Sequence, residues 1–95
     1  MYTILLSRRF KRSFKKLQKS GTLSSSAATD FKIIVATLKA GEKLPIIYRD
    51  HALTGDMWGY RECHIKGDLL LEYKKDDDRL IIDLIDIGSH SYLFG

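Results

Sequence analysis

Three short segments with strand-like patterns, separated by tight turns, occupy the second half of this sequence and constrain its fold more than any other feature; the last two are rich in Leu, Ile and Tyr, and the first is mixed with charged residues. They cover residues 58–65, 68–74 and 80–87. Runs of this length bounded by turn residues are typical of β-strands, and the dipeptide Lys66-Gly67 is typical of a tight hairpin. Lys75–Asp78 supplies the next turn. The sequence therefore predicts an antiparallel meander of three strands.

The N-terminal quarter predicts one strand followed by a helix. Residues 2–6 form an apolar run that is compatible with a strand. Ser7 can cap a helix after it, because its hydroxyl can accept from the free backbone N–H groups of the first turn. Phe10, Phe14 and Leu17 then recur on one helical face, and Gly21 is placed to end the helix.

A second amphipathic segment follows after a short link. Three serines, Ser24, Ser25 and Ser26, offer caps, and Gly41 is placed to stop this helix. Its apolar stripe consists of Ala27, Phe31, Ile34, Val35 and Leu38. The short link implies an antiparallel helical hairpin, whose apolar stripes need a sheet to cover. We therefore predict an α+β fold of order β-α-α-β-β-β, with the hairpin on one face of a small antiparallel sheet and the other face free.

Length and composition limit the class of protein. With 95 residues the chain is expected to form a single domain, residues 1–95, and 44% hydrophobic residues argue against disorder. The only cysteine, Cys63, cannot form an internal disulfide, and no apolar run approaches the ~18 residues of a membrane-spanning helix. Charge follows the apolar start MYTILL, the reverse of a signal peptide. We expect a cytoplasmic protein with no membrane association.

Basic side chains are concentrated in the first predicted helix. The net charge is +4, yet residues 1–20 contain no acidic residue. Such a block suggests a surface that faces a polyanion, and a solvated helix face is the open alternative. The basic residues considered for RNA contact are Arg8, Arg9, Lys11, Arg12, Lys15 and Lys16.

The candidate site residues lie mainly in residues 48–73, the densest mixture of proton donors, proton acceptors and cations. On the predicted strand 58–65, the period of two places Glu62 and His64 on one face, with Arg61 and Cys63 on the other. Asp68 lies just across the hairpin. His51 lies in a predicted long loop, residues 41–57. His90 lies in a C-terminal tail that is expected to fold back on the sheet.

These side chains could cleave RNA. A histidine with an ordinary pKa near 6.5 can give or take a proton at neutral pH. Metal-free cleavage needs a base for the 2′-OH, an acid for the leaving 5′-oxygen, and cations for the phosphate. Two histidines, a carboxylate and either Arg61 or Lys66 would supply them.

Other interpretations of the same residues stay open. Each histidine can be a surface or hydrogen-bonded structural residue. A metal site is conceivable from the histidines with Cys63, Asp68 and Glu62, but no two of them have the spacing of a zinc motif. Trp58 and Tyr60 could stack on bases or pack as ordinary aromatics, and Cys63 is most simply a core residue.

Three segments of the sequence resemble a known family. DHALTGDMWGYRECHI, GDLLLEYKK and GSHSYLFG are similar to the YafQ-like branch of the RelE/ParE superfamily of toxins, and the strand and basic helical hairpin before them match its layout. Two positions depart from the family pattern: Glu62 stands where Asp is more usual, and Leu69 where a close relative would carry an aromatic residue.

The resemblance implies a toxin of a type II toxin–antitoxin pair that enters the ribosome and cuts mRNA, without a metal or other cofactor. By position, His51, His64 and His90 would be catalytic, with His90 the general acid and the base shared between the other two. Glu62 and Asp68 would orient a histidine or tune its pKa. The basic helix would meet ribosomal RNA or antitoxin. Phe94 would help to place the scissile nucleotides, while the role of the motif arginine, Arg61, is left open.

The family also implies partners and competing functions. An antitoxin would wrap the toxin and block its site, and the pair would bind its own operator DNA, mainly through the antitoxin. An alternative within the superfamily is a non-enzymatic, ParE-like inhibitor of DNA gyrase, which needs no histidine constellation. A binding module that has lost catalysis is the third reading.

Overall fold

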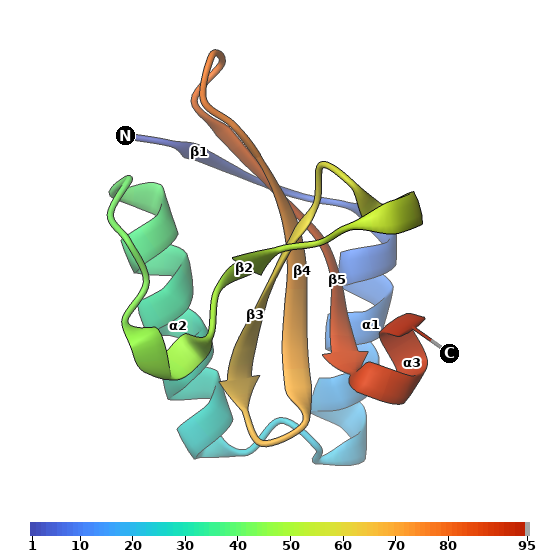
Figure 1. Ribbon diagram of the computed structural model, residues 1–95. Helices are drawn as coiled ribbons and strands as arrows, with labels where there is room; N and C mark the ends of the chain where they lie inside the picture. The colour runs from blue at the N-terminus through green and yellow to red at the C-terminus, as the bar shows by residue number, and fades with distance from the viewer. Residues whose placement is uncertain (95) are drawn as a thin grey trace.

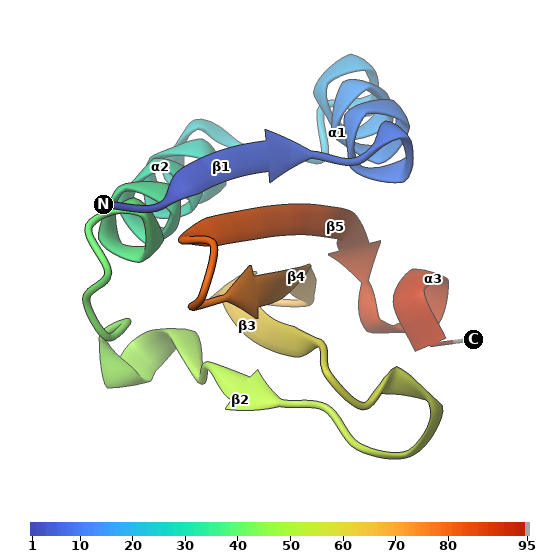
Figure 2. The same ribbon diagram turned by 90° about the horizontal axis from the view of Figure 1, so that it is seen from above.

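The computed structural model describes residues 1–94 and contains a curved sheet with two helices against one side. The elements follow in the order β1 (Thr3–Leu6), α1 (Arg8–Ser20), α2 (Ser25–Lys39), the 3₁₀ turn η1 (Ile46–Tyr48), β2 (His51–Ala52), the 3₁₀ turn η2 (Gly55–Met57), β3 (Arg61–Lys66), β4 (Leu69–Asp76), β5 (Ile81–Ser89) and α3 (His90–Phe94). Figure 2 shows α1 and α2 on one side and β2 on the side away from them.

The sheet has the strand order β1-β5-β4-β3-β2. The predicted meander is confirmed as β3, β4 and β5, which pair antiparallel. The prediction of a wholly antiparallel sheet is wrong, because β1 pairs parallel to β5, with Thr3 opposite Ile81 and Leu6 opposite Leu84. Strand β1 enters the sheet beside the last strand, and sequence periodicity assigns strand faces but does not specify neighbours so far apart in the chain.

Both helices begin at predicted capping serines, and α1 ends at the predicted Gly21, whereas the C-cap of α2 is Ala40, one residue before the predicted Gly41. Ser7 accepts from the backbone N–H of Phe10 at 2.9 Å, and Gly21, with φ 74°, follows the last residue of α1. Ser24 accepts in the same way from Ala27 at 3.0 Å. Helix α2 ends at Lys39, two residues before Gly41. The capping signals therefore fix the lengths of the two helices that cover the sheet.

The predicted loop 41–57 and the predicted start of the next strand need correction. Two 3₁₀ turns and the short strand β2 interrupt the loop, and β2 pairs antiparallel with β3. A two-residue strand is too short for any period to reveal it. Strand β3 begins at Arg61, not Trp58, because the chain turns at Gly59 (φ 96°), where the Tyr60 N–H donates to the Met57 carbonyl. Trp58 is consequently 81% exposed.

The hydrophobic core lies between the helices and the sheet. Both helices contribute apolar side chains to it, and Cys63 is fully buried there, as predicted. The core includes Phe10, Ile34, Leu38, Cys63, Leu71, Tyr73, Ile82, Leu84 and Ile87. Leu70 is buried as well but lies outside this cluster, because alternation turns it toward the other face of β4.

The C-terminal residues fold back on the sheet, as predicted, in the form of α3. The ring of Tyr92 lies directly over Gly88 on β5, so that a Cβ at position 88 would stand 2.5 Å from a ring carbon. Only glycine therefore permits this close approach. Gly95 lies outside the described residues.

Within residues 1–94, none of the helices has the length and apolar character required to span a bilayer.

Candidate functional site

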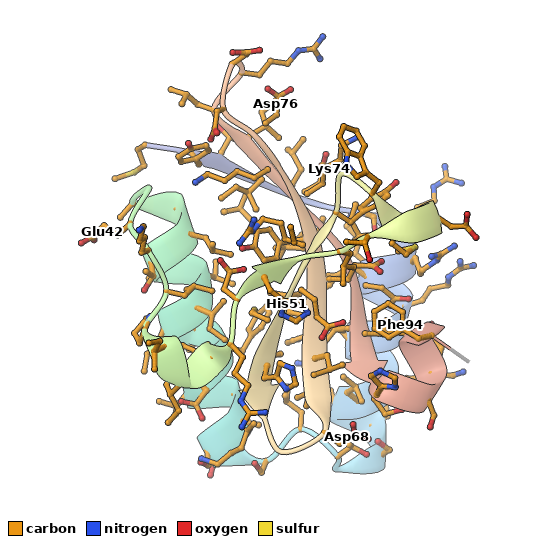
Figure 3. All side chains as sticks on the ribbon, in the orientation of Figure 1. Glu42, His51, Asp68, Lys74, Asp76 and Phe94 are labelled. Carbon is orange, nitrogen blue, oxygen red and sulfur yellow. The ribbon has the colours of Figure 1, made fainter. Side chains whose placement is uncertain are left out.

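Two histidines converge on one buried carboxylate on the sheet face that the helices leave free. Strand β2 places His51 directly opposite Glu62 of β3, and His64 follows two residues later on the same face. The Nε2 atoms of both histidines lie 3.6 Å from the same Glu62 oxygen, Oε1. The Glu62 side chain is only 6% exposed, whereas both imidazoles reach solvent. Figure 3 shows His51 in front of the sheet.

The backbone assigns one tautomer to His51. Its Nδ1–H donates to the carbonyl of Arg49 at 2.7 Å, because a carbonyl oxygen can only accept. The other nitrogen, Nε2, is then the atom with a free lone pair, and it is the one turned toward Glu62. His51 can accordingly take up a proton at Nε2 beside a carboxylate that stabilises the resulting positive charge.

Glu62 belongs to a row of three buried carboxyl groups that crosses the sheet. Register places Glu62 opposite Glu72, and Glu72 opposite Asp86, on three adjacent strands. Burial raises the pKa of Glu72, and the neighbouring Asp86 raises it further. Glu72 and Asp86 are not among the candidate site residues predicted from the sequence, because their strands were interpreted as apolar. The alternation Asp68, Leu70, Glu72 would have placed Glu72 on the same face as Asp68.

Asp86 is held by groups from the basic helix and the C-terminus. Its Oδ1 accepts from the Ser13 hydroxyl at 2.6 Å and from the Ile87 N–H at 2.9 Å. The Ser13 hydroxyl is also 2.9 Å from that of Tyr92. Arg9 Nε lies 4.0 Å from Asp86 Oδ2. Arg9 is thereby the basic residue of α1 that meets the carboxylate row.

The remaining predicted basic residues of α1 are exposed. They are Arg8, Lys11, Arg12, Lys15 and Lys16. Their exposure fits either a polyanion-facing surface or a solvated helix face, so their contact with RNA stays a prediction.

His90, Asp68 and Phe94 form a second group at the end of β5. The backbone N–H of His90 donates to Asp68 Oδ1 at 3.3 Å, so Asp68 contacts the main chain of α3 and not the imidazole. The rings of His90 and Phe94, one helical turn apart, have centroids 5.1 Å apart. Both side chains are exposed, and Figure 3 shows Asp68 and Phe94 at the border of the sheet.

Strand register relates the two groups. His64 is opposite Leu70, and Leu70 is opposite Gly88, two residues before His90. Two strand spacings make the distance from His64 to Gly88 about 10 Å along this row. The structure thus brings His51 and His64 together, and His90 begins α3 just after the end of β5, so that a site shared by all three histidines stays a prediction.

The other two predicted cations point elsewhere. Arg61 Nη2 donates to Asp50 at 3.0 Å, on the face of β3 that carries Cys63, as the period of two predicted. Lys66 donates to Ser26 and Asp30 of α2. Both cations therefore have carboxylate partners away from Glu62 and His64, and a role for either in phosphate binding stays a prediction.

Cysteine and metal chemistry find little support in the geometry. Burial raises the pKa of Cys63 far above its ordinary value, so the thiol stays protonated and cannot serve as a nucleophile. Among residues 1–94, no group of three or more His, Cys, Asp or Glu side chains is arranged to hold a metal ion.

Fold and site together define a class: a small α+β protein with histidines and buried acids on an open sheet face beside a basic helix. Residues 2–95 match the family described as "Bacterial toxin of type II toxin-antitoxin system, YafQ", and the chain belongs to this family. The resemblance seen in the sequence is thereby confirmed.

Known relatives agree with this assignment. The mRNA interferase toxin YafQ of Escherichia coli (strain K12) is 42% identical over 52 residues, which cover 55% of this chain and 54% of that protein. The match thus spans about half the length of this curated relative.

Solved structures match over nearly the whole chain. A copper-bound mutant toxin from Helicobacter pylori has a TM-score of 0.87 at 36% identity, covering 99% of this chain and 100% of that one. YafQ from the E. coli strain BL21(DE3) has a TM-score of 0.86 at 28% identity, and a DinJ–YafQ complex from E. coli has 0.83 at 29%, both covering 100% of each chain.

Proposed function

We propose that this protein is the toxin of a type II toxin–antitoxin pair and cleaves mRNA on the ribosome. The observation that carries the proposal is the pair of imidazoles on Glu62, each 3.6 Å from the same carboxylate oxygen, on an open face. That geometry supports proton transfer near neutral pH. The curated E. coli relative is named an mRNA interferase toxin, which supports RNA as the substrate.

The proposed reaction is an internal transfer at phosphorus. His51 or His64 removes the proton of a 2′-OH, and the 2′-oxygen forms a bond to phosphorus as the bond to the 5′-oxygen breaks. His90 gives a proton to that leaving oxygen. The products are a 2′,3′-cyclic phosphate and a free 5′-hydroxyl, so no oxidant, water or metal enters the balance.

The acids and cations have supporting roles in this proposal. Glu62 stabilises positive charge on the two imidazoles that it faces, and Asp68 holds the N-terminus of α3, which carries His90. Arg9 and the exposed basic side chains of α1 attract the RNA backbone. Phe94, whose ring centroid lies 5.1 Å from that of His90, helps to place a nucleotide.

Primer extension on mRNA after a pulse of expression tests the proposal. Wild type is expected to produce discrete cuts in translated messages, and His90→Ala is expected to remove them. Lys32→Ala, on the exposed surface of α2, serves as the matched control and should cut like wild type. A variant with alanine at positions 51, 64 and 90 that still cuts mRNA would refute the nuclease. Metal independence is tested by treating the purified toxin with a chelator, removing the chelator, and then adding the toxin to a purified translation reaction, where the cuts should be the same as with untreated toxin.

The same cells distinguish the gyrase-inhibitor alternative. Cleavage of mRNA stops translation first, whereas gyrase poisoning stops DNA replication first. We also expect an antitoxin encoded beside this protein to restore growth, since a relative has been crystallised as a DinJ–YafQ complex. Binding of operator DNA should then require the antitoxin in the mixture.

A further inference from the structure

A three-residue cluster behind β2 holds the segment that carries His51. Arg61 reaches both oxygens of Asp50, with Nη2 at 3.0 Å from Oδ2 and Nε at 3.4 Å from Oδ1. The Tyr73 hydroxyl donates to Asp50 Oδ1, and Arg61 Nε lies 3.3 Å from that hydroxyl oxygen. We call Asp50, Arg61 and Tyr73 the Asp50 clamp. It joins the loop before β2 to two neighbouring strands, β3 and β4.

The clamp matters because this loop has little other anchorage. A cavity of about 760 Å³ lies beside it, lined in part by the clamp residues themselves. Ile46 and Ile47 are 96% and 74% exposed, so the loop buries few apolar side chains. Tyr48 is the exception: it is buried, and its hydroxyl donates to Asp30 of α2 at 2.9 Å. Tyr48 and Asp50 are thus the two attachments just before His51.

The position of Asp50 is coupled to the tautomer of His51. Arg49 adopts a left-handed backbone conformation (φ 48°), which costs free energy for a residue with a side chain. In that conformation the Arg49 carbonyl accepts from His51 Nδ1–H at 2.7 Å. Because Asp50 lies between Arg49 and His51, its anchorage to β3 and β4 maintains the turn that presents this carbonyl.

We propose that Asp50, Arg61 and Tyr73 are positioning residues that fix the orientation and the Nδ1–H tautomer of His51 for RNA cleavage. This inference rests on the proposed function. Arg61 acts through Asp50 and not by binding phosphate. Its guanidinium lies on the face of β3 opposite Glu62, where Nε and Nη2 donate to the two carboxylate oxygens of Asp50.

Two of the three clamp residues keep their protons throughout the neutral pH range. The hydrogen bond to Asp50 raises the pKa of Arg61. Burial raises the pKa of Tyr73, and its bond to Asp50 raises that pKa further. Arg61 therefore stays cationic and Tyr73 stays protonated through the neutral range. The clamp can hold His51 in both protonation states that a general base must visit.

The test compares Arg61→Gln, Asp50→Asn and Tyr73→Phe with Arg79→Gln. The control removes an arginine–aspartate contact of similar chemistry, Arg79 to Asp76, from the exposed turn between β4 and β5. The first readout is the nitrogen NMR spectrum of the imidazoles, which distinguishes Nδ1–H from Nε2–H. Arg61→Gln and Asp50→Asn should convert His51 to a mixture of tautomers and leave the tautomer of His90 unchanged. Arg79→Gln should leave the tautomers of both histidines unchanged.

The second readout is cleavage by programmed ribosomes. Arg61→Gln and Asp50→Asn should lower kcat by about 10²-fold, the cost of misplacing a catalytic group, with KM changed little. Loss of a phosphate contact would instead raise KM. Arg61→Lys, which retains the charge but not the two-point contact, should recover part of kcat. Tyr73→Phe, which keeps the ring in the core, should also lower kcat with little change in KM. This variant tests the clamp if Arg61→Gln does not fold.

Failure of this inference can be told apart from failure of the proposed function. If His51→Ala loses activity while the clamp variants keep both the wild-type kcat and the Nδ1–H tautomer, the clamp is overturned and the nuclease stands. If the clamp variants disturb the tautomer but the triple histidine variant still cuts mRNA, the nuclease mechanism is overturned. A rise in KM with unchanged kcat in Arg61→Gln would also overturn the inference.

Discussion

The two histidine groups contain the same residue types but connect them differently. In the first, the carboxylate of Glu62 faces the ring nitrogens of His51 and His64. In the second, the carboxylate of Asp68 accepts from the backbone N–H of His90 and leaves its ring without that contact. A carboxylate beside an imidazole stabilises its charged form, whereas one at a helix start positions the backbone. The difference indicates an electrostatic role for Glu62 and a positioning role for Asp68.

Burial separates the two groups in the same way. Glu62 is buried within a row of carboxyl groups on three paired strands. Asp68, His90 and Phe94 are exposed, on a turn and a five-residue helix next to the chain end. In the first group, Glu62 and His64 lie on β3, which is paired with a strand on each side, whereas the second group depends on how well α3 stays docked on β5. Substitutions should therefore affect chemistry at the first group and mobility at the second.

The largest expected effect is the loss of a proton-transferring side chain. His90→Ala and His64→Ala should each lower cleavage by about 10²–10⁴-fold, the usual contribution of a general acid or base. Both side chains are at least partly exposed, so the melting temperature should change little. Cleavage rates on programmed ribosomes, beside thermal melts of the same preparations, measure the two effects. Full activity of His90→Ala would remove the second group from the site.

The next effect in size distinguishes electrostatics from positioning. Glu62→Gln keeps the shape of the side chain but removes the charge that faces two imidazoles. Removing a charge beside the reacting imidazoles should lower the rate roughly tenfold, which corresponds to about 1.4 kcal/mol in the activation barrier. We expect this loss in kcat, together with a changed pH–rate profile. An unchanged profile would contradict the electrostatic role of Glu62.

Much of this first group follows from sequence alone, and the reason is strand periodicity. Alternation along β3 correctly places Glu62 and His64 on one face and Arg61 and Cys63 on the other. His51 could be named as a candidate from its polar surroundings and from the family resemblance, but it could not be placed on this face, because β2 has two residues and leaves no periodic signal. Its contact with Glu62 depends on strand pairing that only the three-dimensional structure reveals.

The carboxylate row and the parallel strand show what sequence could not specify. Glu72 and Asp86 are adjacent because a bulge between Glu72 and Tyr73 sets the β4–β5 register, and bulges have no reliable sequence signal. The pairing of β1 with β5 joins the two ends of the chain, where neighbour choice depends on the packing of both helices. Local propensity therefore predicted the elements, and non-local packing determined which polar groups meet.

A smaller effect concerns the docking of α3. Asp68→Ala removes the acceptor for the His90 N–H and should cost about 1 kcal/mol, the usual value of a helix cap. Amide exchange of residues 90–94 should accelerate while exchange in β3 stays unchanged, and cleavage should fall only a few-fold. Asp68→Asn retains an acceptor oxygen and is the matched control. Equal exchange in Asp68→Ala and wild type would show that Asp68 does not hold α3.

The smallest expected effect is a gain in stability at the centre of the carboxylate row. Burial and the neighbouring Asp86 raise the pKa of Glu72 in the folded protein. The folded state then binds this proton more tightly than the unfolded state, so stability falls as the pH rises through the unfolded pKa toward the folded one. Glu72→Gln removes a group that is costly to ionise, and it should raise the free energy of unfolding at neutral pH.

The pH dependence of that gain separates it from a simple packing change. Well below the unfolded pKa of about 4.3, Glu72 is protonated in both states, so the pH-dependent difference between wild type and Glu72→Gln should vanish. Urea unfolding from about pH 3 to pH 8 measures the difference, with Glu42→Gln on the exposed loop as a control that should show none. A constant difference at all pH values would mean that Gln packs differently and that no ionisation cost is stored at Glu72. A gain that grows with pH would mean that the row keeps an unfavourable charge beneath the proposed site, as active sites do when function and stability conflict.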